Sequence, residues 1–179
     1  MLFFALKCFY FILPAYFANM APVIVKNRFN YLAVPIDFGK KIKGKELFGK
    51  NKTFRGFTFA ILFAIAITYL QFLLYEFNFF KNLSFINYSS WLLLGFLFGF
   101  GAIFGDLIES FIKRRLNLKS GEKFIPWDQL DFVIGALIFV NLIIDITWKI
   151  VLFIIVISII GHILVNHAAY YLKIRKEKW

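Results

Sequence analysis

The sequence predicts an all-α integral membrane protein with five transmembrane helices. Apolar residues make up 61% of the 179-residue chain and aromatic residues 21%, and the mean hydropathy is +0.75. Ordinary soluble domains contain fewer apolar residues than this. Apolar stretches also recur at lengths near the roughly 20 residues that a helix needs to cross a bilayer. We therefore expect residues 1–179 to form a single transmembrane domain with no separate soluble part.

Five apolar stretches are the candidate spans. The first lacks a basic leader and continues past Pro22, so we interpret it as a retained helix and not as a cleaved signal peptide. The fourth has the shortest apolar run because Asp131 and Asp145 bracket it. Glycines in the third favour close packing against other helices, with a ligand-binding role as the alternative: Gly95, Gly99, Gly101 and Gly105. In chain order the expected spans are residues 2–25, 56–75, 91–112, 130–146 and 149–172.

Lysine and arginine are unevenly distributed between the connecting segments. Nine lie in residues 26–55, five in residues 113–128 and four after Leu172, whereas the other connections hold only Lys81 and Lys149. Cytoplasmic loops carry such an excess of basic residues. We therefore expect both basic loops and the C-terminus in the cytoplasm and the N-terminus outside, as an odd number of spans requires.

Residues 105–131 combine acidic and basic side chains within an otherwise apolar protein. Asp106 and Glu109 lie inside the third apolar stretch, where ionised groups are costly unless they pair, bind a metal or face water. Asp128 and Asp131 follow at the start of the next predicted helix. Carboxylate oxygens suit Mg²⁺, and neighbouring basic residues suit phosphate. The segment therefore predicts a site for both at the cytoplasmic surface.

Helical spacing places the polar residues of the third stretch on one stripe, namely Asp106, Glu109, Ser110, Lys113 and Arg114. The stripe rises by about 10 Å from Asp106 to Lys113, from the apolar interior toward the cytoplasm. Two purely structural interpretations stay open. In the first interpretation, Glu109 and Lys113 form an internal ion pair, which leaves Asp106 without a partner. In the second, Asp128 caps the helix that follows.

A second candidate site precedes the second span, in residues 48–56 (Phe-Gly-Lys-Asn-Lys-Thr-Phe-Arg-Gly). Backbone N–H groups and the positive end of a helix favour phosphate at such a place, although the spacing of a P-loop is absent. The segment supplies glycine, asparagine, threonine and three basic residues for such a ligand, although taken alone it is a weak signal. The other lysines of this loop have a simpler explanation as a patch attracted to anionic lipid headgroups: Lys40, Lys41, Lys43 and Lys45.

These motifs resemble a known enzyme family. Residues 105–115, followed by Pro126 and Asp-Gln-Leu-Asp at 128–131, are similar to the C-terminal signature of the CTP-dependent phosphatidate cytidylyltransferases. The chain lacks the Gly/His-rich stretch that usually precedes the final Asp-Arg-x-Asp of the bacterial enzymes, and it is shorter than they are. Further similarity is to the short archaeal branch, the CDP-archaeol synthases, in residues 13–22, 35–39, 48–56 and 131–136.

The resemblance implies a reaction of CTP with 2,3-bis-O-(geranylgeranyl)-sn-glycerol 1-phosphate that yields a CDP-activated ether lipid and pyrophosphate. A lipid phosphate oxygen would attack the α-phosphorus of CTP in line, with Mg²⁺ neutralising the developing charge. By this resemblance the metal ligands are Asp106, Asp128 and Asp131, and Lys113 and Arg114 are catalytic residues that hold phosphates. The substrate-binding residues are Asn19, Asp37, Lys52, Thr53, Arg55, Glu109 and Ser110, with Glu109 also a weaker metal candidate.

Other classes of function remain open. A diacyl phosphatidate is the alternative lipid substrate. A cation or proton transporter also places carboxylates in membrane helices, but nearer the middle of the membrane and on several helices. A non-enzymatic lipid binder explains the net charge of +11 but not Asp106. We expect a multi-pass enzyme of the cell membrane, with CTP and an isoprenoid glycerol phosphate as partners and no nucleic acid.

The charge distribution predicts a topology that cysteine labelling can test. Cys8 is the only cysteine, so a Cys8→Ala background is free of thiols. Lys43→Cys and a cysteine added at the C-terminus should react with an impermeant maleimide only from the cytoplasmic side of sealed vesicles. Asn82→Cys should react only from the outside. A C-terminus that reacts outside would overturn the five-span arrangement and separate the two basic loops.

Overall fold

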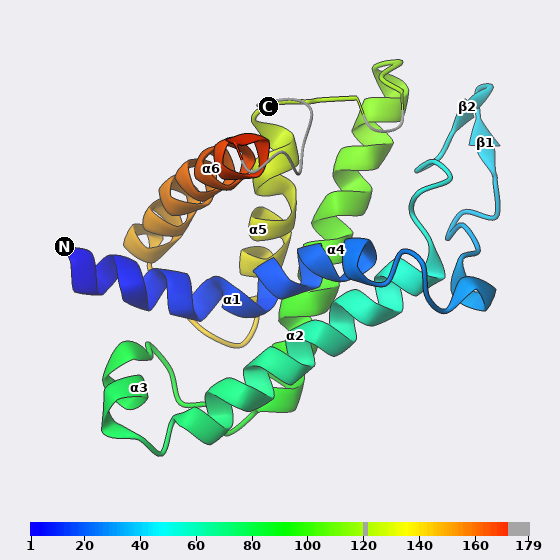
Figure 1. Ribbon diagram of the computed structural model, residues 1–179. Helices are drawn as coiled ribbons and strands as arrows, with labels where there is room; N and C mark the ends of the chain where they lie inside the picture. The colour runs from blue at the N-terminus through cyan, green and yellow to red at the C-terminus, as the bar shows by residue number, and fades with distance from the viewer. Residues whose placement is uncertain (120–121, 172–179) are drawn as a thin grey trace.

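The computed structural model describes residues 1–119 and 122–171 and is mainly helical (Figure 1). The basic tail after Leu172, on which part of the orientation argument rests, lies outside the described residues. The elements in chain order are α1 (Leu2–Ile24), the short 3₁₀ helix η1 (Asn30–Leu32), β1 (Lys41–Ile42), β2 (Lys45–Glu46), α2 (Phe54–Leu74), α3 (Asn78–Leu83), α4 (Trp91–Arg115), α5 (Trp127–Val140) and α6 (Trp148–Tyr171).

Within the part of the chain that the structure describes, three helices, α1, α2 and α4, are long and apolar enough to cross a membrane, and α6 adds a shorter apolar stretch, Trp148–Leu164. The expected membrane class and all-helical bundle are therefore confirmed. The fourth expected span, residues 130–146, is displaced, because α5 begins at Trp127 and ends at Val140. Its 14 residues rise by about 21 Å, less than the roughly 30 Å of a hydrocarbon core. Beyond the helix, the Asn141 side chain accepts the Ile146 N–H (3.0 Å) and so closes a turn in place of further helix.

The basic loop contains a small antiparallel hairpin, β1–β2, which the sequence pattern does not predict. Its turn residues Lys43 and Gly44 have φ values of 51° and 78°, the left-handed conformation of a tight two-residue hairpin turn. Arg115, the last residue of α4, donates to the carbonyls of Ile42 (3.0 Å) and Lys45 (3.3 Å). Lys45 Nζ returns a bond to the Arg115 carbonyl (2.9 Å). The hairpin is therefore fastened to the end of α4.

The packing of α4 depends on small residues on two of its faces. A Cβ placed on Gly99 would lie 2.6 Å from the Ile61 Cα of α2, and one on Gly101 would lie 2.6 Å from the Gly135 carbonyl oxygen of α5. Both distances are far below van der Waals contact, so the helix backbones touch where a side chain would not fit. The expected close contact is confirmed for all four glycines of this helix, Gly95, Gly99, Gly101 and Gly105.

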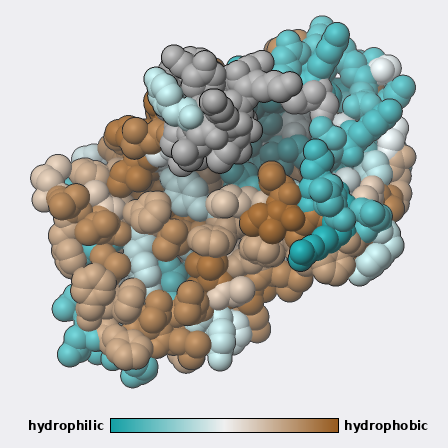
Figure 2. Space-filling model, viewed as in Figure 1, coloured by the Kyte–Doolittle hydropathy of each residue, from teal (hydrophilic) through white to brown (hydrophobic). Residues whose placement is uncertain are grey.

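Polar residues gather at two ends of the molecule. Figure 2 shows hydrophilic residues over the β1–β2 end and at the opposite, α3 end, with a mainly apolar surface between them. The N-terminal half of α1 belongs to the α3 end, where Lys7 Nζ lies 5.0 Å from the ring centre of Phe85 and Lys149 Nζ lies 5.2 Å from that of Phe4. The basic hairpin and the end of α4 therefore share one end of the bundle, and the N-terminus lies at the other.

The glycine contacts predict the effect of adding one methyl group. Gly105→Ala would push a Cβ into the Asp131 carbonyl, so the variant should lose about 1–3 kcal/mol of unfolding free energy through overpacking. Gly161→Ala in α6 is the matched control, because a Cβ there meets nothing within 4 Å. Thermal unfolding in detergent should show a lower midpoint for the first variant and an unchanged or higher one for the second. Equal midpoints would show that α4 and α5 do not need this close contact.

Candidate active site

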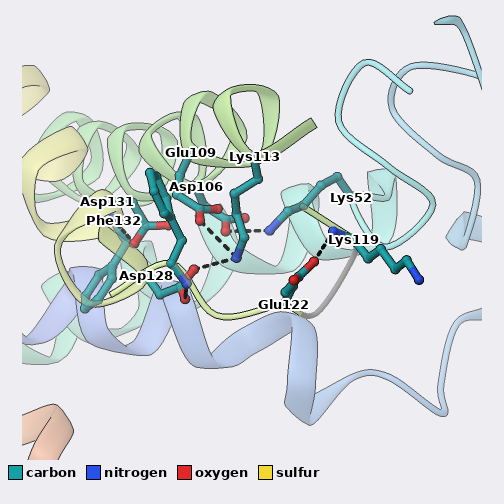
Figure 3. A network of polar contacts seen from close by, with 10 residues as sticks. Lys52, Asp106, Glu109, Lys113, Lys119, Glu122, Asp128, Asp131 and Phe132 are labelled. Carbon is teal, nitrogen blue, oxygen red and sulfur yellow. Dashed lines mark hydrogen bonds and ion pairs between the residues drawn. The ribbon is translucent and has the colours of Figure 1, made fainter. Parts of the chain in front are cut away.

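Three carboxylates converge between α4 and α5. Asp106, Glu109 and Asp131 each offer one oxygen atom, and the three atoms lie within 4.8 Å of one another (Figure 3). We call these residues the acidic cluster. Ionised carboxylates at such separations repel each other unless a cation lies among them. Three oxygen donors that converge in this way match the ligands that Mg²⁺ prefers.

Two lysines compensate part of this charge. Lys52 Nζ lies 2.5 Å from Asp106 Oδ1, and Lys113 Nζ lies 3.1 Å from Glu109 Oε1 and 2.7 Å from Asp128 Oδ1 (Figure 3). The Lys113 side chain is only 8% exposed, and such a buried ammonium requires partners of this kind. Four carboxylates and two ammonium groups leave a formal excess of two negative charges, which one divalent cation would balance.

The acidic cluster differs in one member from the metal set that the sequence favours. Glu109 takes the place expected for Asp128. The two oxygens of Asp128 bind Lys113 Nζ and the backbone N–H of Phe124 (2.6 Å), so this carboxylate holds the lysine and the α4–α5 connection together. The Glu109–Lys113 ion pair of the first structural interpretation does form, but Asp106 is not left without a partner, because it pairs with Lys52. The second interpretation is wrong, because Pro126 occupies the N-cap position of α5 and no side chain caps that helix.

Local structure at the start of α2 places Lys52 opposite Asp106. Residues 34–36 run antiparallel to residues 52–54, with Ile36 N–H bonded to the Lys52 carbonyl (2.8 Å) and Phe54 N–H to the Val34 carbonyl (2.9 Å). Thr53 is the N-cap of α2, and its Oγ1 accepts the Gly56 N–H (3.3 Å). The cap and the paired segments fix the backbone on both sides of Lys52.

A cavity of about 210 Å³ lies beside the acidic cluster, between α1, α2 and α4, and its wall is partly apolar and partly polar. We call it the polar cavity because charged Lys52 and Asp106 line it. Asn19 of α1, Lys52 and Thr53 before α2, and Asp106 of α4 are among its lining residues. Four residues that the sequence assigns to the site, from three separate segments, therefore line one cavity. The cavity meets the acidic cluster at Asp106, which belongs to both.

Asp37 has a different setting from the cavity residues. Its buried carboxylate accepts backbone N–H bonds from Gly39 (2.9 Å) and Phe48 (3.0 Å) and so closes the basic loop. Burial alone would raise the pKa of Asp37, but the N–H bonds from Phe48, Gly39 and Gly49 outweigh burial and hold that pKa below its ordinary value. Asp37 therefore supports the loop that carries Lys52.

Three further residues that the sequence assigns to the site, Arg55, Arg114 and Ser110, belong neither to the acidic cluster nor to the lining of the polar cavity. Arg55 Nη1 donates to the Arg28 carbonyl (3.0 Å) and Asn30 Oδ1 (3.2 Å), which are contacts with the α1–α2 connection and not with the carboxylates. Arg114 is buried in the last turn of α4, near Gly49. Ser110 is buried on the same helix, one residue after Glu109.

An acidic cluster that could hold a metal ion lies between membrane-type helices, with two lysines and the polar cavity beside it. This arrangement is typical of an enzyme that acts within a membrane on a charged substrate. Comparisons with known proteins agree with this class and make it specific. Residues 1–179 match the family described as CarS-like, CDP-archaeol synthase. The chain therefore belongs to the CDP-archaeol synthase family, and it is a cytidylyltransferase of membrane-lipid biosynthesis. The resemblance seen in the sequence motifs is confirmed.

Individual relatives match along almost their whole length. The CDP-archaeol synthase of Methanocaldococcus jannaschii is 38% identical over 95% of this chain and 94% of its own. That of Pyrococcus abyssi is 39% identical over 97% of each chain. A solved structure described as an intramembrane enzyme for archaeal membrane lipids biosynthesis superposes with a TM-score of 0.73 at 28% identity, covering 88% of this chain and 91% of that chain.

The acidic cluster predicts how carboxamide substitutions combine. Asp106→Asn and Asp131→Asn each remove an anionic oxygen from one shared site, so each should lower turnover by about a hundredfold or more. The double variant should be scarcely worse than either single one, because residues that act as a unit are non-additive. Initial rates of labelled product formation, on protein that remains monodisperse in detergent, measure both effects.

Asp145→Asn is the matched control for this series, because Asp145 is exposed in the α5–α6 connection, beyond the opposite end of α5 from Asp131. It should leave turnover unchanged. Multiplicative losses in the double variant would mean that Asp106 and Asp131 act at separate places and do not share a cation.

Proposed function

We propose that this chain transfers the cytidylyl group of CTP to 2,3-bis-O-(geranylgeranyl)-sn-glycerol 1-phosphate at the acidic cluster. An oxygen of the lipid phosphate forms a bond to the α-phosphorus of CTP, the bond from that phosphorus to the oxygen bridging to the β-phosphorus breaks, and pyrophosphate leaves. The observation that carries the proposal is the convergence of Asp106, Glu109 and Asp131 beside a polar cavity and two lysines. Membership of the CDP-archaeol synthase family supports it.

The acidic cluster fits a resident Mg²⁺, with Asp106, Glu109 and Asp131 as the residues that would hold it. A bound ion would neutralise negative charge on the triphosphate and on the leaving pyrophosphate. Asp128 has a supporting role in this proposal, because it binds Lys113 and keeps that ammonium next to Glu109. The carboxylates thus divide into a group that faces the cation and one that positions a lysine.

Lys52 is the residue best placed to bind a phosphate of CTP, because it lines the polar cavity and contacts the acidic cluster. An entering phosphate oxygen would replace Asp106 as the partner of its ammonium and form a charge-assisted hydrogen bond. Thr53 and Asn19 add polar groups to the same cavity. We assign further phosphate contacts to Lys113 and Arg114, whereas Arg55 would first have to leave Arg28 and Asn30.

We also infer a five-span arrangement in the cell membrane, with the site facing the cytoplasm and residues 1–179 forming one catalytic domain. The hairpin and the end of α4 lie together at the strongly basic end of the bundle, which the positive-inside rule assigns to the cytoplasm. CTP is present on that side. In this arrangement α5, with the turn after it, and α6 are the fourth and fifth crossings.

One assay tests the reaction and the substrate together. Purified protein in detergent should transfer label from cytidine-labelled CTP to the ether-linked isoprenoid glycerol phosphate, and chelation of Mg²⁺ by EDTA should stop the reaction until Mg²⁺ is restored. Diacyl phosphatidate should accept label at least about tenfold more slowly, because its chains differ in shape and linkage. Preferential labelling of the diacyl lipid would show that diacyl phosphatidate, and not the ether lipid, is the substrate. No labelling of either lipid would refute the proposed reaction.

A pair of lysine variants provides the matched control in the same assay. Lys52→Ala removes the ammonium that contacts Asp106 and should raise the KM for CTP and lower turnover. Lys43→Ala removes an exposed charge from the hairpin turn and should change little beyond membrane attraction of about 1 kcal/mol. Similar losses in both variants would mean that the loop acts through its total charge.

A further inference from the structure

Pro14 lies inside α1, in a part of the helix that is buried in the bundle. A proline has no backbone N–H, so the Tyr10 carbonyl, four residues earlier, loses the partner that a helix normally supplies. The proline ring also presses against that carbonyl, which bends the helix at this point. A backbone polar group without a partner is costly inside a membrane, so the freed carbonyl needs a donor from another element.

Gln71 of α2 supplies this donor. Its Nε2 lies 2.6 Å from the Tyr10 carbonyl oxygen, and the residue is only 2% exposed. Among the described residues, the Gln71 Oε1 atom has no hydrogen-bond partner. An apolar side chain of similar size would fill the same space without burying an unpaired oxygen. Packing therefore does not explain Gln71, whereas its N–H donor to α1 does.

A second contact fixes α1 on the other side of Pro14. The Tyr16 hydroxyl donates to Ser158 Oγ of α6 (2.7 Å), and the Tyr16 ring packs against that of Phe132 in α5, with 5.4 Å between the ring centres. Phe132 directly follows Asp131 of the acidic cluster. The two arms of the bent helix are therefore held separately, the N-terminal arm by α2 and the C-terminal arm by α5 and α6.

The C-terminal arm carries Asn19, which lines the polar cavity. Asn19 follows Pro14 at a helix rise of about 7.5 Å, so the angle of the bend sets where Asn19 lies in the cavity wall. We propose that Gln71 and Tyr16 are positioning residues, which keep α1 bent so that the polar cavity has the shape that binds CTP. The inference rests on the proposed function, which supplies CTP as the occupant. Neither residue lines the cavity, so each acts through α1.

A split between kinetic constants tests this role. Gln71→Leu leaves the Tyr10 carbonyl without its donor and frees the N-terminal arm, so it should raise the KM for CTP by about tenfold, with a smaller change in kcat. Tyr16→Phe frees the C-terminal arm and should have the same effect. Thr68→Val is the matched control, because the buried Thr68 hydroxyl donates to the Ala64 carbonyl of its own helix (2.9 Å). An unchanged KM for CTP in either arm variant would overturn the proposal for that residue.

A double variant separates positioning from stability. Pro14→Ala restores the N–H that pairs with the Tyr10 carbonyl within α1, so Pro14→Ala/Gln71→Leu should unfold at a higher temperature in detergent than Gln71→Leu. The double variant has a straighter α1, so its KM for CTP, and its dissociation constant for CTP measured by calorimetry with Mg²⁺, should stay raised by about tenfold. A KM that returns to the wild-type value together with the unfolding midpoint would show that Gln71 only stabilises the bundle, which overturns the proposal. Wild-type protein that neither binds nor uses CTP would refute the proposed function and this inference with it.

Discussion

The contact of α4 with α5 through glycine backbones is the constraint on which the site depends. Gly101 and Gly105 of α4 meet Gly135 and the Asp131 carbonyl of α5 at distances that leave no room for a Cβ. Only this close approach brings the Asp131 carboxylate within 4.8 Å of the two carboxylates of α4. Larger residues would separate the helices and so disperse the acidic cluster. A packing feature of the membrane bundle thus determines the geometry of the chemistry.

Burying four carboxylates and two lysines in an apolar bundle is costly unless every charge has partners. Lys113 has two carboxylate partners and Lys52 has one, and Asp128 also accepts a backbone N–H. Such pairing offsets much of the desolvation penalty of ion burial. The remaining formal excess of negative charge is what favours a divalent cation.

The basic loop contributes structure as well as charge. Asp37 ties its turns together through backbone N–H bonds, and Arg115 attaches the hairpin to the end of α4. Lys45, which the sequence alone suggests is part of a diffuse lipid-binding patch, bonds to the Arg115 carbonyl. These contacts hold the segment that carries Lys52 and Thr53 above the acidic cluster. The loop is therefore a scaffold for the polar cavity.

The sequence by itself determined the membrane class, the long apolar helices, the close packing of the α4 glycines and the family, because composition, helical periodicity and local motifs are properties of short segments. It also identified Asn19, Lys52, Thr53 and Asp106, which the fold gathers around one cavity. Only the tertiary structure decided that Glu109 and not Asp128 joins the acidic cluster, that Asp106 pairs with Lys52 from 54 positions earlier, and that α5 ends at Val140. Those outcomes depend on how helices approach and rotate against each other, which spacing along one helix does not specify.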